Sequence, residues 1–519
     1  DRLAALGYRD PRGAMRHIEA LTNGVSRRAE IQRHLMPVLL GWFAEGVDAD
    51  AGLLGFRLVS ESLGTTSWYL RMLRDSPAAA ERLCHILSSS RYITDLLEDA
   101  PTSITWLDKV ADLQPLSAGA LKAEITSLLS RHEDSADAMR AVRYLRRREI
   151  LRIAMGDALN LLSVQQVCTG LATVDECTIG AALALAEREE INAGERDEKT
   201  TPQKSDAPQR DSQEATGKNP EDEQRNPLLT EITVIAMGRL GGAENGFGSD
   251  ADVMFVHRPV EGADEKEAQA QANRIVNRLM QLIKQPVRPA IRAERPLEVD
   301  ADLRPEGKQG ALVRSLDSYR AYYERWAETW EFQALLRARP IAGSEDLGSA
   351  FVELIDPYRY PREFTAEQAQ QVRRMKARVE HERMPHGADR TRQLKLGRGG
   401  LSDVEWLVQL IQLQHAHKVE GLRTTSTLEA LDAAVQANLV AAEDAEVLRD
   451  AWLLATKIRG GNVLRGVRQS DLLPTLRDAL EAVARWSGYT PGSARQLEED
   501  YLRVTRNARK VYERLFFEG

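Results

Sequence analysis

Residues 248–252, which read Gly-Ser-Asp-Ala-Asp, constrain this chain most, because they run directly into the apolar stretch Val253–Val256. Such a stretch predicts a buried strand. Successive side chains of a strand point to opposite faces, so Asp250 and Asp252 project from the same face. Two carboxylates on one face can bind the same divalent cations, and Mg²⁺ prefers oxygen ligands. The segment therefore predicts a metal site at the start of a strand.

The residues around the two carboxylates suit phosphate. Gly248 lets a phosphate approach the backbone closely, and the hydroxyl of Ser249 can donate a hydrogen bond to a phosphate oxygen. Upstream, the β-branched run 232–237 predicts a second strand, which ends in a glycine-rich turn from Gly238 that can also open toward phosphate. This combination indicates Mg²⁺-nucleotide chemistry.

A two-metal site requires a third carboxylate, and the strand-like segment 297–305 offers Asp300. The order of a strand, a glycine-rich turn, a Gly-Ser-Asp-x-Asp strand and a distant aspartate resembles that of the nucleotidyltransferase superfamily. The alternative is a solvated turn rich in aspartate. The second strand and Asp300 both argue against that alternative.

Four segments resemble glutamine synthetase adenylyltransferase, and the match extends over nearly the whole chain. They are 237–252, 299–305, 330–335 and 395–405. That family carries two nucleotidyltransferase halves in tandem, whereas this chain shows one such site. It therefore resembles a single half, and is most similar to the C-terminal, adenylylating half of an actinobacterial member. Asp302 stands where the family pattern has Arg, so it either joins the metal site or faces solvent.

The resemblance implies transfer of AMP from ATP to a tyrosine hydroxyl of glutamine synthetase, which regulates nitrogen assimilation. Asp250, Asp252 and Asp300 are then the catalytic residues and the ligands of two Mg²⁺ ions, with Mn²⁺ as the alternative metal. Asp300 is also the candidate to accept the tyrosine proton. The expected nucleotide-binding residues are Gly238, Gly248, Ser249, Arg304 and Lys395.

Two other functions remain open from the sequence. Phosphorolytic removal of AMP from glutamine synthetase uses the same three carboxylates, and chemistry alone does not separate it from addition. The second is a non-catalytic module that senses nucleotide while its helices dock glutamine synthetase or a PII-type signal protein. The intact aspartates argue against such a module.

Composition indicates a large cytoplasmic protein that contacts neither nucleic acid nor a membrane. The chain has 519 residues, with 70 Lys and Arg against 78 Asp and Glu. Nucleic-acid binding normally demands a basic face, and no apolar run approaches the ~20 residues of a membrane span. Cys84, Cys168 and Cys177 lack metal-site spacing and are predicted to be buried thiols in a reducing compartment. A start at Asp1, without Met or a signal-like stretch, suits an excised fragment.

We predict an α+β fold, mostly helical, in which a mixed nucleotidyltransferase sheet is flanked by all-helical regions. The expected parts are a helical region at 1–193, a disordered linker at 194–227, the catalytic domain at 228–343 and a helical bundle at 344–519. Between 195 and 226 the only apolar residues are Ala207 and Ala215. Burial there cannot offset the loss of chain entropy, which is why a linker is expected.

Two further runs are predicted to be structural. Arg146, Arg147 and Arg148 lie within a helical apolar pattern, which favours one basic, solvated helix face over a phosphate patch. Between 312 and 339 the chain turns helical, and aromatic residues recur every three or four positions. This stripe is predicted to be core, and it consists of Tyr319, Tyr322, Tyr323, Trp326 and Trp330.

The segment 395–400, Lys-Leu-Gly-Arg-Gly-Gly, precedes a helix that Ser402 and Glu405 are predicted to start as a capping box. A basic, glycine-rich loop at a helix N-terminus is suited to bind an anion. Alternatively, the glycines only permit a tight entry into the helix, whose dipole the acidic residues complement. The sequence leaves both interpretations open.

Overall fold

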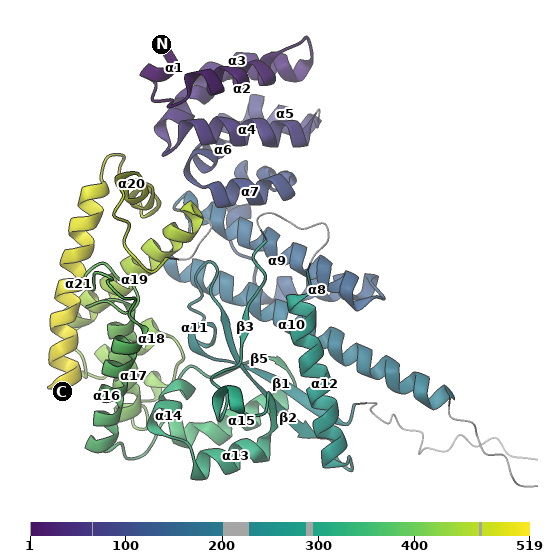
Figure 1. Ribbon diagram of the computed structural model, residues 1–519, viewed down its shortest axis with the longest axis vertical. Coiled ribbons are helices and arrows are strands. Elements are labelled where there is room, and N and C mark those ends of the chain that lie inside the picture. Colours follow the sequence, from purple (N-terminus) through teal and green to yellow (C-terminus); the bar gives the residue numbers. More distant parts are fainter. Residues whose placement is uncertain (1, 65, 201–227, 287–293, 467–469, 519) are drawn as a thin grey trace, which may run out of the picture.

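The computed structural model describes residues 2–64, 66–200, 228–286, 294–466 and 470–518. Helices dominate these residues, and one small mixed sheet lies among them, so the predicted mostly helical α+β class is confirmed. Figure 1 shows the N-terminal helices stacked at the top and the sheet below them. The C-terminal helices stand beside the sheet.

The described residues between 2 and 200 are mainly helical, as predicted for the N-terminal region. The α-helices are α1 (Arg2–Ala5), α2 (Pro11–Thr22), α3 (Arg27–Glu45), α4 (Ala49–Leu63), α5 (Ser67–Asp75), α6 (Pro77–Ser89), α7 (Arg91–Asp99), α8 (Ala118–Arg131), α9 (Ser135–Ala158) and α10 (Val164–Thr200), with 3-10 turns η1 (Pro101–Leu107) and η2 (Val110–Leu113). Local sequence explains their starts: Asp10 caps α2 by accepting the amide of Gly13, and Pro11 follows. The three cysteines are buried free thiols, as predicted.

Helix α10 runs to Thr200, through the first part of the predicted linker 194–227. The remainder of that linker, 201–227, lies outside the described residues. Within α10, the stretch Val164–Gly194 is long and apolar enough to cross a membrane by length and composition. However, 72% of its most apolar window is buried inside the protein, as in a core helix.

The sheet has the strand order β3-β2-β1-β5, and β4 also pairs with β2. The strands are β1 (Thr230–Ala236), β2 (Ala251–Pro259), β3 (Val299–Asp300), β4 (Val313–Ser315) and β5 (Arg339–Gly343). β1 is antiparallel to β2 and β5, whereas β3 and β4 run parallel to β2. The strands predicted at 232–237 and after Asp252 are therefore confirmed.

Helices cover both faces of the sheet, which explains why its strands read as continuous apolar runs. Val253 and Phe255 pack into the core shared with α12 (Glu265–Lys284) and the N-terminal helices. Met254 and Val256 face the opposite way. They pack with α13 (Leu316–Arg325) and α15 (Glu345–Arg359).

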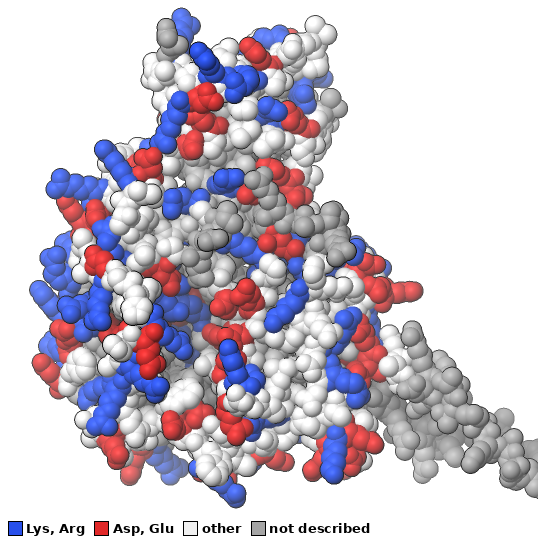
Figure 2. Space-filling model, viewed as in Figure 1, with Lys and Arg blue, Asp and Glu red and all other residues white. Residues whose placement is uncertain are grey.

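The remaining helices form a C-terminal bundle with its own core (Figure 1). Its α-helices are α16 (Ala366–Arg383), α17 (Leu401–His415), α18 (Thr427–Gln436), α19 (Ala442–Arg465), α20 (Arg477–Trp486) and α21 (Ala494–Phe517). The 3-10 turn η4 (Glu420–Leu422) lies between α17 and α18, and the short helical segments outside the bundle are α11 (Gly238–Gly241), η3 (Gly307–Gln309) and α14 (Thr329–Leu335). Figure 2 shows acidic and basic side chains interspersed over one face of the molecule. The domain limits at 193, 227 and 343 stay predictions.

The arginine run of α9 is not a solvated face, so that prediction is wrong. Arg146 and Arg147 are only 9% and 8% exposed. Arg146 pairs with Asp175 of α10 at 2.8 Å, and Arg147 pairs with Glu294 at 2.9 Å. The helical pattern was visible in the sequence, but the acidic partners lie far away along the chain.

The aromatic stripe is only partly core. Tyr319 and Tyr323 are buried as predicted, whereas Trp326 is 73% exposed. The helical stretch predicted at 312–339 is interrupted between α13 and α14, where the amide of Glu328 donates to the side chain of Glu331 at 2.8 Å. This contact starts a new helix and takes Trp326 out of the stripe.

We predict that Gly241→Ala strongly destabilises the fold. A Cβ at this position would lie 1.7 Å from the carbonyl oxygen of Arg337 and 2.9 Å from that of Ala236, so the backbone itself must move. We expect the free energy of unfolding to fall by at least about 2–3 kcal/mol, seen as a lower melting temperature. Gly460→Ala in α19 is the control, because its nearest neighbour is 3.7 Å away. Equal melting of the two variants would contradict this packing.

Candidate active site

Asp250, Asp252 and Asp300 come together at the edge where β2 meets β3. The two strands run parallel with Asp252 beside Asp300, and Asp250 directly precedes β2. The amide of Ala251 donates to the carbonyl oxygen of Glu298 at 2.8 Å, which fixes this register. Neighbouring residues of adjacent strands present their side chains on the same face, so the three carboxylates share one face.

Burial and neighbouring carboxylates raise the pKa of both Asp250 and Asp252. Burial is the main cause that raises the pKa of Asp252 to about 6, followed by the charges of Asp300 and Asp250. The pKa of Asp250 is also raised, first by burial and then by Glu298 and Asp300. Crowded carboxylates of this kind are typical of functional sites that gain from a nearby positive charge.

Glu298 is a site residue that the sequence interpretation missed. It is exposed beside Asp250 and contributes to the raised pKa of that residue. Glu298 and Asp300 are two positions apart, just as Asp250 and Asp252 are, and this repeated spacing was the available signal.

The carboxylate oxygens fit a hard divalent cation such as Mg²⁺. In the part of the chain that the structure describes, no group of three or more acidic, His or Cys side chains is placed to hold a metal ion without other ligands. Asp250, Asp252 and Asp300 would therefore need further oxygen ligands to hold such an ion. The phosphates of a nucleotide are the natural source of those ligands.

Gly238 is required by the carboxylate of Asp252. It has a φ of 52°, and a Cβ there would lie 2.2 Å from Oδ2 of Asp252. Gly238 was predicted to bind nucleotide in a turn that opens toward phosphate, and this role stays a prediction. The amide of Met237 donates to the carbonyl oxygen of Asp252 at 2.8 Å, which holds the turn against β2.

Gly248 and Ser249 form a tight turn beside the carboxylates. Gly248 has a φ of 72°, and a Cβ there would approach the guanidinium of Arg295 to 3.3 Å. The hydroxyl oxygen of Ser249 accepts the amide of Gly246 at 2.8 Å. This bond leaves the hydroxyl proton of Ser249 as a donor for another group.

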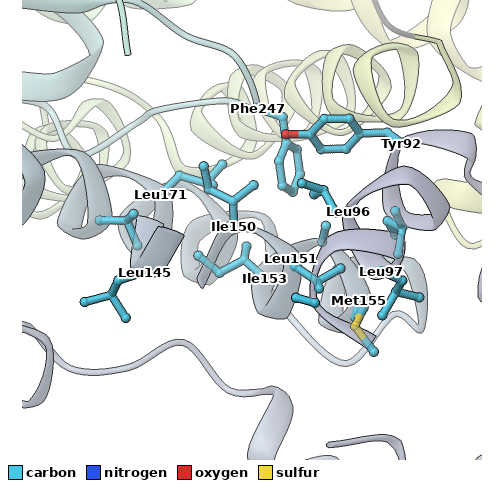
Figure 3. Close-up of a cluster of buried hydrophobic side chains, with 14 of the residues drawn as sticks. Tyr92, Leu96, Leu97, Leu145, Ile150, Leu151, Ile153, Met155, Leu171 and Phe247 are labelled. Atoms are coloured by element: carbon cyan, nitrogen blue, oxygen red, sulfur yellow. The ribbon is translucent and has the colours of Figure 1, made fainter. Parts of the chain in front are cut away.

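The site loop, residues 243–249, is anchored in the N-terminal helices. Asn245 donates to Asp175 of α10 at 2.9 Å, and Asp175 also accepts from Arg146 of α9 at 2.8 Å. Figure 3 shows Phe247 in one cluster with Tyr92 and with leucine and isoleucine side chains from α7, α9 and α10. The turn that carries Gly248 is thus held by buried contacts on the residues just before it.

Lys395 supplies a positive charge opposite the carboxylates, since it lowers the pKa of both Asp250 and Asp252. Its own pKa is lowered, chiefly by burial and then by Arg239 and Arg459. Lys395 belongs to the C-terminal bundle, so the bundle contributes directly to the site. Arg239 pairs with Glu405 and Arg459 pairs with Asp471, whereas the ammonium of Lys395 is suited to a phosphate oxygen.

The predicted capping box is wrong, although the helix starts where expected. Helix α17 begins at Leu401, and Gly400 precedes it without a side-chain cap. Instead of capping α17, Glu405 accepts from Arg239 at 3.3 Å and from the indole of Trp452 at 3.4 Å. Glu405 therefore connects the bundle to the turn after β1.

The glycines of 397–400 permit a tight entry into α17. A Cβ on Gly399 would lie 1.9 Å from the carbonyl oxygen of Thr505. The amide of Gly399 donates to the buried carboxylate of Asp403 at 2.7 Å, and the amide of Ser402 donates to the carbonyl of Lys395 at 2.9 Å. These amides have internal partners, which favours the structural interpretation over an anion site.

Asp302 and Arg304 are directed to their own loop. The guanidinium of Arg304 donates to the carbonyl oxygens of Ala301, Lys308 and Gly310. The carboxylate of Asp302 lies 3.3 Å from Lys308, while its amide donates to Oδ1 of Asp300 at 2.7 Å. The structure does not bring Arg304 to the carboxylates, and its nucleotide-binding role stays a prediction.

Comparisons with known proteins match two family models to this chain. The family model described as glutamate-ammonia ligase adenylyltransferase matches residues 80–210 and 206–354. A model described as GlnD PII-uridylyltransferase matches residues 373–516, which lie in the C-terminal bundle.

Curated relatives match along the chain, and each is named bifunctional glutamine synthetase adenylyltransferase/adenylyl-removing enzyme. The relative from Leifsonia xyli is 47% identical over 99% of this chain and 47% of its own length. The relative from Streptomyces avermitilis is 46% identical over 100% of this chain and 50% of its own length. The relative from Mycobacterium tuberculosis H37Rv is 44% identical over 99% and 49%, respectively. The chain thus spans about half the length of these relatives.

We predict that Gly238→Ala impairs Mg²⁺-nucleotide binding while the protein stays folded, because the new methyl group must displace the carboxylate of Asp252. The control is Gly262→Ala, which has a φ of 81° and no atom within 4 Å of the new Cβ. Both variants share the backbone strain of about 1 kcal/mol. Thermal shifts with Mg²⁺ and a non-hydrolysable ATP analogue should be normal for Gly262→Ala and nearly lost for Gly238→Ala. Equal shifts would refute the role of Gly238.

Proposed function

Since the chain belongs to the glutamate-ammonia ligase adenylyltransferase family, we propose that it transfers AMP from ATP to a tyrosine hydroxyl of glutamine synthetase. The observation that carries the proposal is the convergence of Asp250, Asp252 and Asp300 at one strand edge, opposite Lys395. We further propose that the chain is the C-terminal, adenylylating half of an actinobacterial enzyme. Its span of about half of the bifunctional relatives supports a single half, and the choice of the C-terminal half rests on the resemblance of residues 238–252 and of the closing helices.

Asp250, Asp252 and Asp300 would hold two Mg²⁺ ions, or Mn²⁺ in their place, which when bound neutralise phosphate charge and acidify a coordinated hydroxyl. Gly248 and Ser249 position phosphate oxygens, and Lys395 balances their charge. Asp300 accepts the proton of the tyrosine, which with a pKa of ~10 is a poor nucleophile at pH 7. The amide of Asp302 orients Asp300 for this task by donating to its Oδ1.

The bonds exchanged define the reaction. The tyrosine oxygen attacks the α-phosphorus of ATP, and the bond from that phosphorus to the oxygen bridging to the β-phosphate breaks. Pyrophosphate leaves, and the tyrosine proton passes to Asp300. The carboxylates serve equally for attack by inorganic phosphate on the phosphorus of tyrosyl-AMP, which breaks the bond to the tyrosine oxygen, returns a proton to that oxygen and releases ADP. Phosphorolytic removal is therefore the alternative reaction at the same site. A purely nucleotide-sensing module would not need the proton acceptor.

The proposed partners follow from the family. Glutamine synthetase is the protein substrate, and a PII-type signal protein is a proposed regulator. The match of residues 373–516 to a PII-uridylyltransferase model supports the second proposal. We place the reaction in the cytoplasm, with no nucleic acid and no membrane as partner.

We expect radiolabel from the α-phosphate of ATP to appear on glutamine synthetase, because attack occurs at the α-phosphorus. Asp252→Asn should reduce this transfer at least a thousandfold, since it removes the charge of a metal ligand with almost no change in volume. Asp302→Asn is the matched control and should stay within a few-fold of the parent, because Asp302 faces Lys308. Transfer of γ-label without α-label would sink the proposal.

We also expect Asp250→Asn to melt no lower than the parent in the absence of metal. The variant removes a carboxylate whose pKa is raised by burial, Glu298 and Asp300. The parent should gain melting temperature from Mg²⁺ with a non-hydrolysable ATP analogue, whereas Asp250→Asn should gain little. Asp317→Asn, at an exposed position of α13, is the control that should gain as the parent does. A variant that melts well below the metal-free parent would identify Asp250 as a structural residue.

A further inference from the structure

A cavity of about 920 Å³ lies between α14 and the C-terminal bundle. Its walls come from α14, α16, α17 and the segments 393–396 and 470–472. This volume lies within the range of about 300–1,000 Å³ that is usual for small-molecule sites. Lys395 lines the cavity and also acts on Asp250 and Asp252. The cavity therefore adjoins the carboxylate site and shares its cation.

The cavity suits a flat aromatic ligand. Trp330 and Trp406 line it, together with the flexible apolar side chain of Met375. The indole of Trp330 donates to Glu328 at 3.0 Å, which fixes the orientation of that ring. Aromatic walls favour stacking with a planar ring, and any nucleobase can stack in this way because every base has a π-face.

Gln333 gives the cavity a specific polar group. Its side chain is 96% buried, because Gln333 retains only 4% exposure, and it lines the cavity. Its Nε2 donates to Oε1 of Gln409 at 2.7 Å, which orients the amide. Its Oε1 is buried and has no hydrogen-bond partner among the described residues. A buried acceptor of this kind is costly unless a ligand supplies an N–H donor.

We propose that this cavity binds the purine ring of the nucleotide and that Oε1 of Gln333 accepts the exocyclic amino group of adenine. The proposal rests on the function proposed above and names the nucleotide specificity of that site. Adenine presents an N–H donor at C6, whereas guanine and hypoxanthine present a carbonyl oxygen there. With the base in the cavity, the ribose and phosphates lead past Lys395 toward Asp250 and Asp252.

The test separates base recognition from catalysis by using nucleosides without phosphate or metal. Adenosine and purine riboside differ only by the amino group, and their binding is followed by quenching of tryptophan fluorescence and by calorimetry. We expect purine riboside to bind the parent about tenfold more weakly, as for the loss of one hydrogen bond to a buried acceptor. Equal binding of the two nucleosides, or no binding of either, would overturn the proposal even if AMP transfer is demonstrated.

Gln333→Met keeps the length of the side chain and removes the amide. It should bind adenosine about tenfold more weakly than the parent does and should lose the preference for adenosine over purine riboside. Gln371→Met is the matched control. Gln371 lies in α16, accepts a hydrogen bond from Thr329 of α14, and lines a separate, neighbouring cavity. It should keep the parental preference. If Gln333→Met retains that preference as well, Gln333 does not recognise the base.

The variant Asp252→Asn distinguishes the proposed base site from the proposed AMP transfer. Asp252 does not line the cavity, so this variant should retain parental adenosine binding after AMP transfer has been lost. Loss of adenosine binding in Asp252→Asn would place the base at the carboxylates and overturn the assignment of the cavity. Because the comparison of nucleosides on the unmodified protein needs no variant, the proposal stays testable if Gln333→Met does not fold.

Discussion

The buried ion pair between Glu244 and Arg337 is the interaction on which the arrangement of the site depends. Glu244, in the site loop, is 4% exposed and lies 2.9 Å from the guanidinium of Arg337, which leads into β5. It also accepts the amide of Thr427 at 2.6 Å and its hydroxyl at 3.0 Å. Burial raises the pKa of Glu244, and Arg337 and Thr427 oppose that effect. Breaking such a pair by removing one partner typically costs about 3–5 kcal/mol, so loop, sheet and α18 stay joined.

The site therefore draws on all three parts of the chain. Contacts of Asn245 and Phe247 tie the site loop to the N-terminal helices, and Glu244 ties it to the C-terminal bundle. From the bundle, Lys395 acts on Asp250 and Glu405 accepts a hydrogen bond from Arg239, in the turn after β1. A core of five strands alone would leave the site loop without these contacts on both sides. The helical regions hold the turn in place, in addition to any role in contacting other proteins.

The sequence predicted those features that arise from local rules. Period-two alternation placed Asp250 and Asp252 on one face, and the strand before Gly238 followed from its β-branched residues. Features that depend on distant partners were not predictable. The Ser402 and Glu405 pattern satisfied the local rule for a cap, but Arg239, 166 positions away, binds Glu405 instead. Arg146 is buried for the same reason, since Asp175 of another helix neutralises it.

The two sides of the site carry charges of opposite sign. Asp250, Asp252 and Asp300 lie on the sheet, and Lys395 approaches them from the bundle. A cation alone is attracted by the carboxylates but repelled by Lys395. A nucleotide alone is attracted by Lys395 but repelled by the carboxylates. A Mg²⁺-nucleotide complex carries charge of both signs and satisfies both sides at once. The binding free energies of metal and nucleotide are therefore coupled, and each ligand raises the affinity for the other by the same factor.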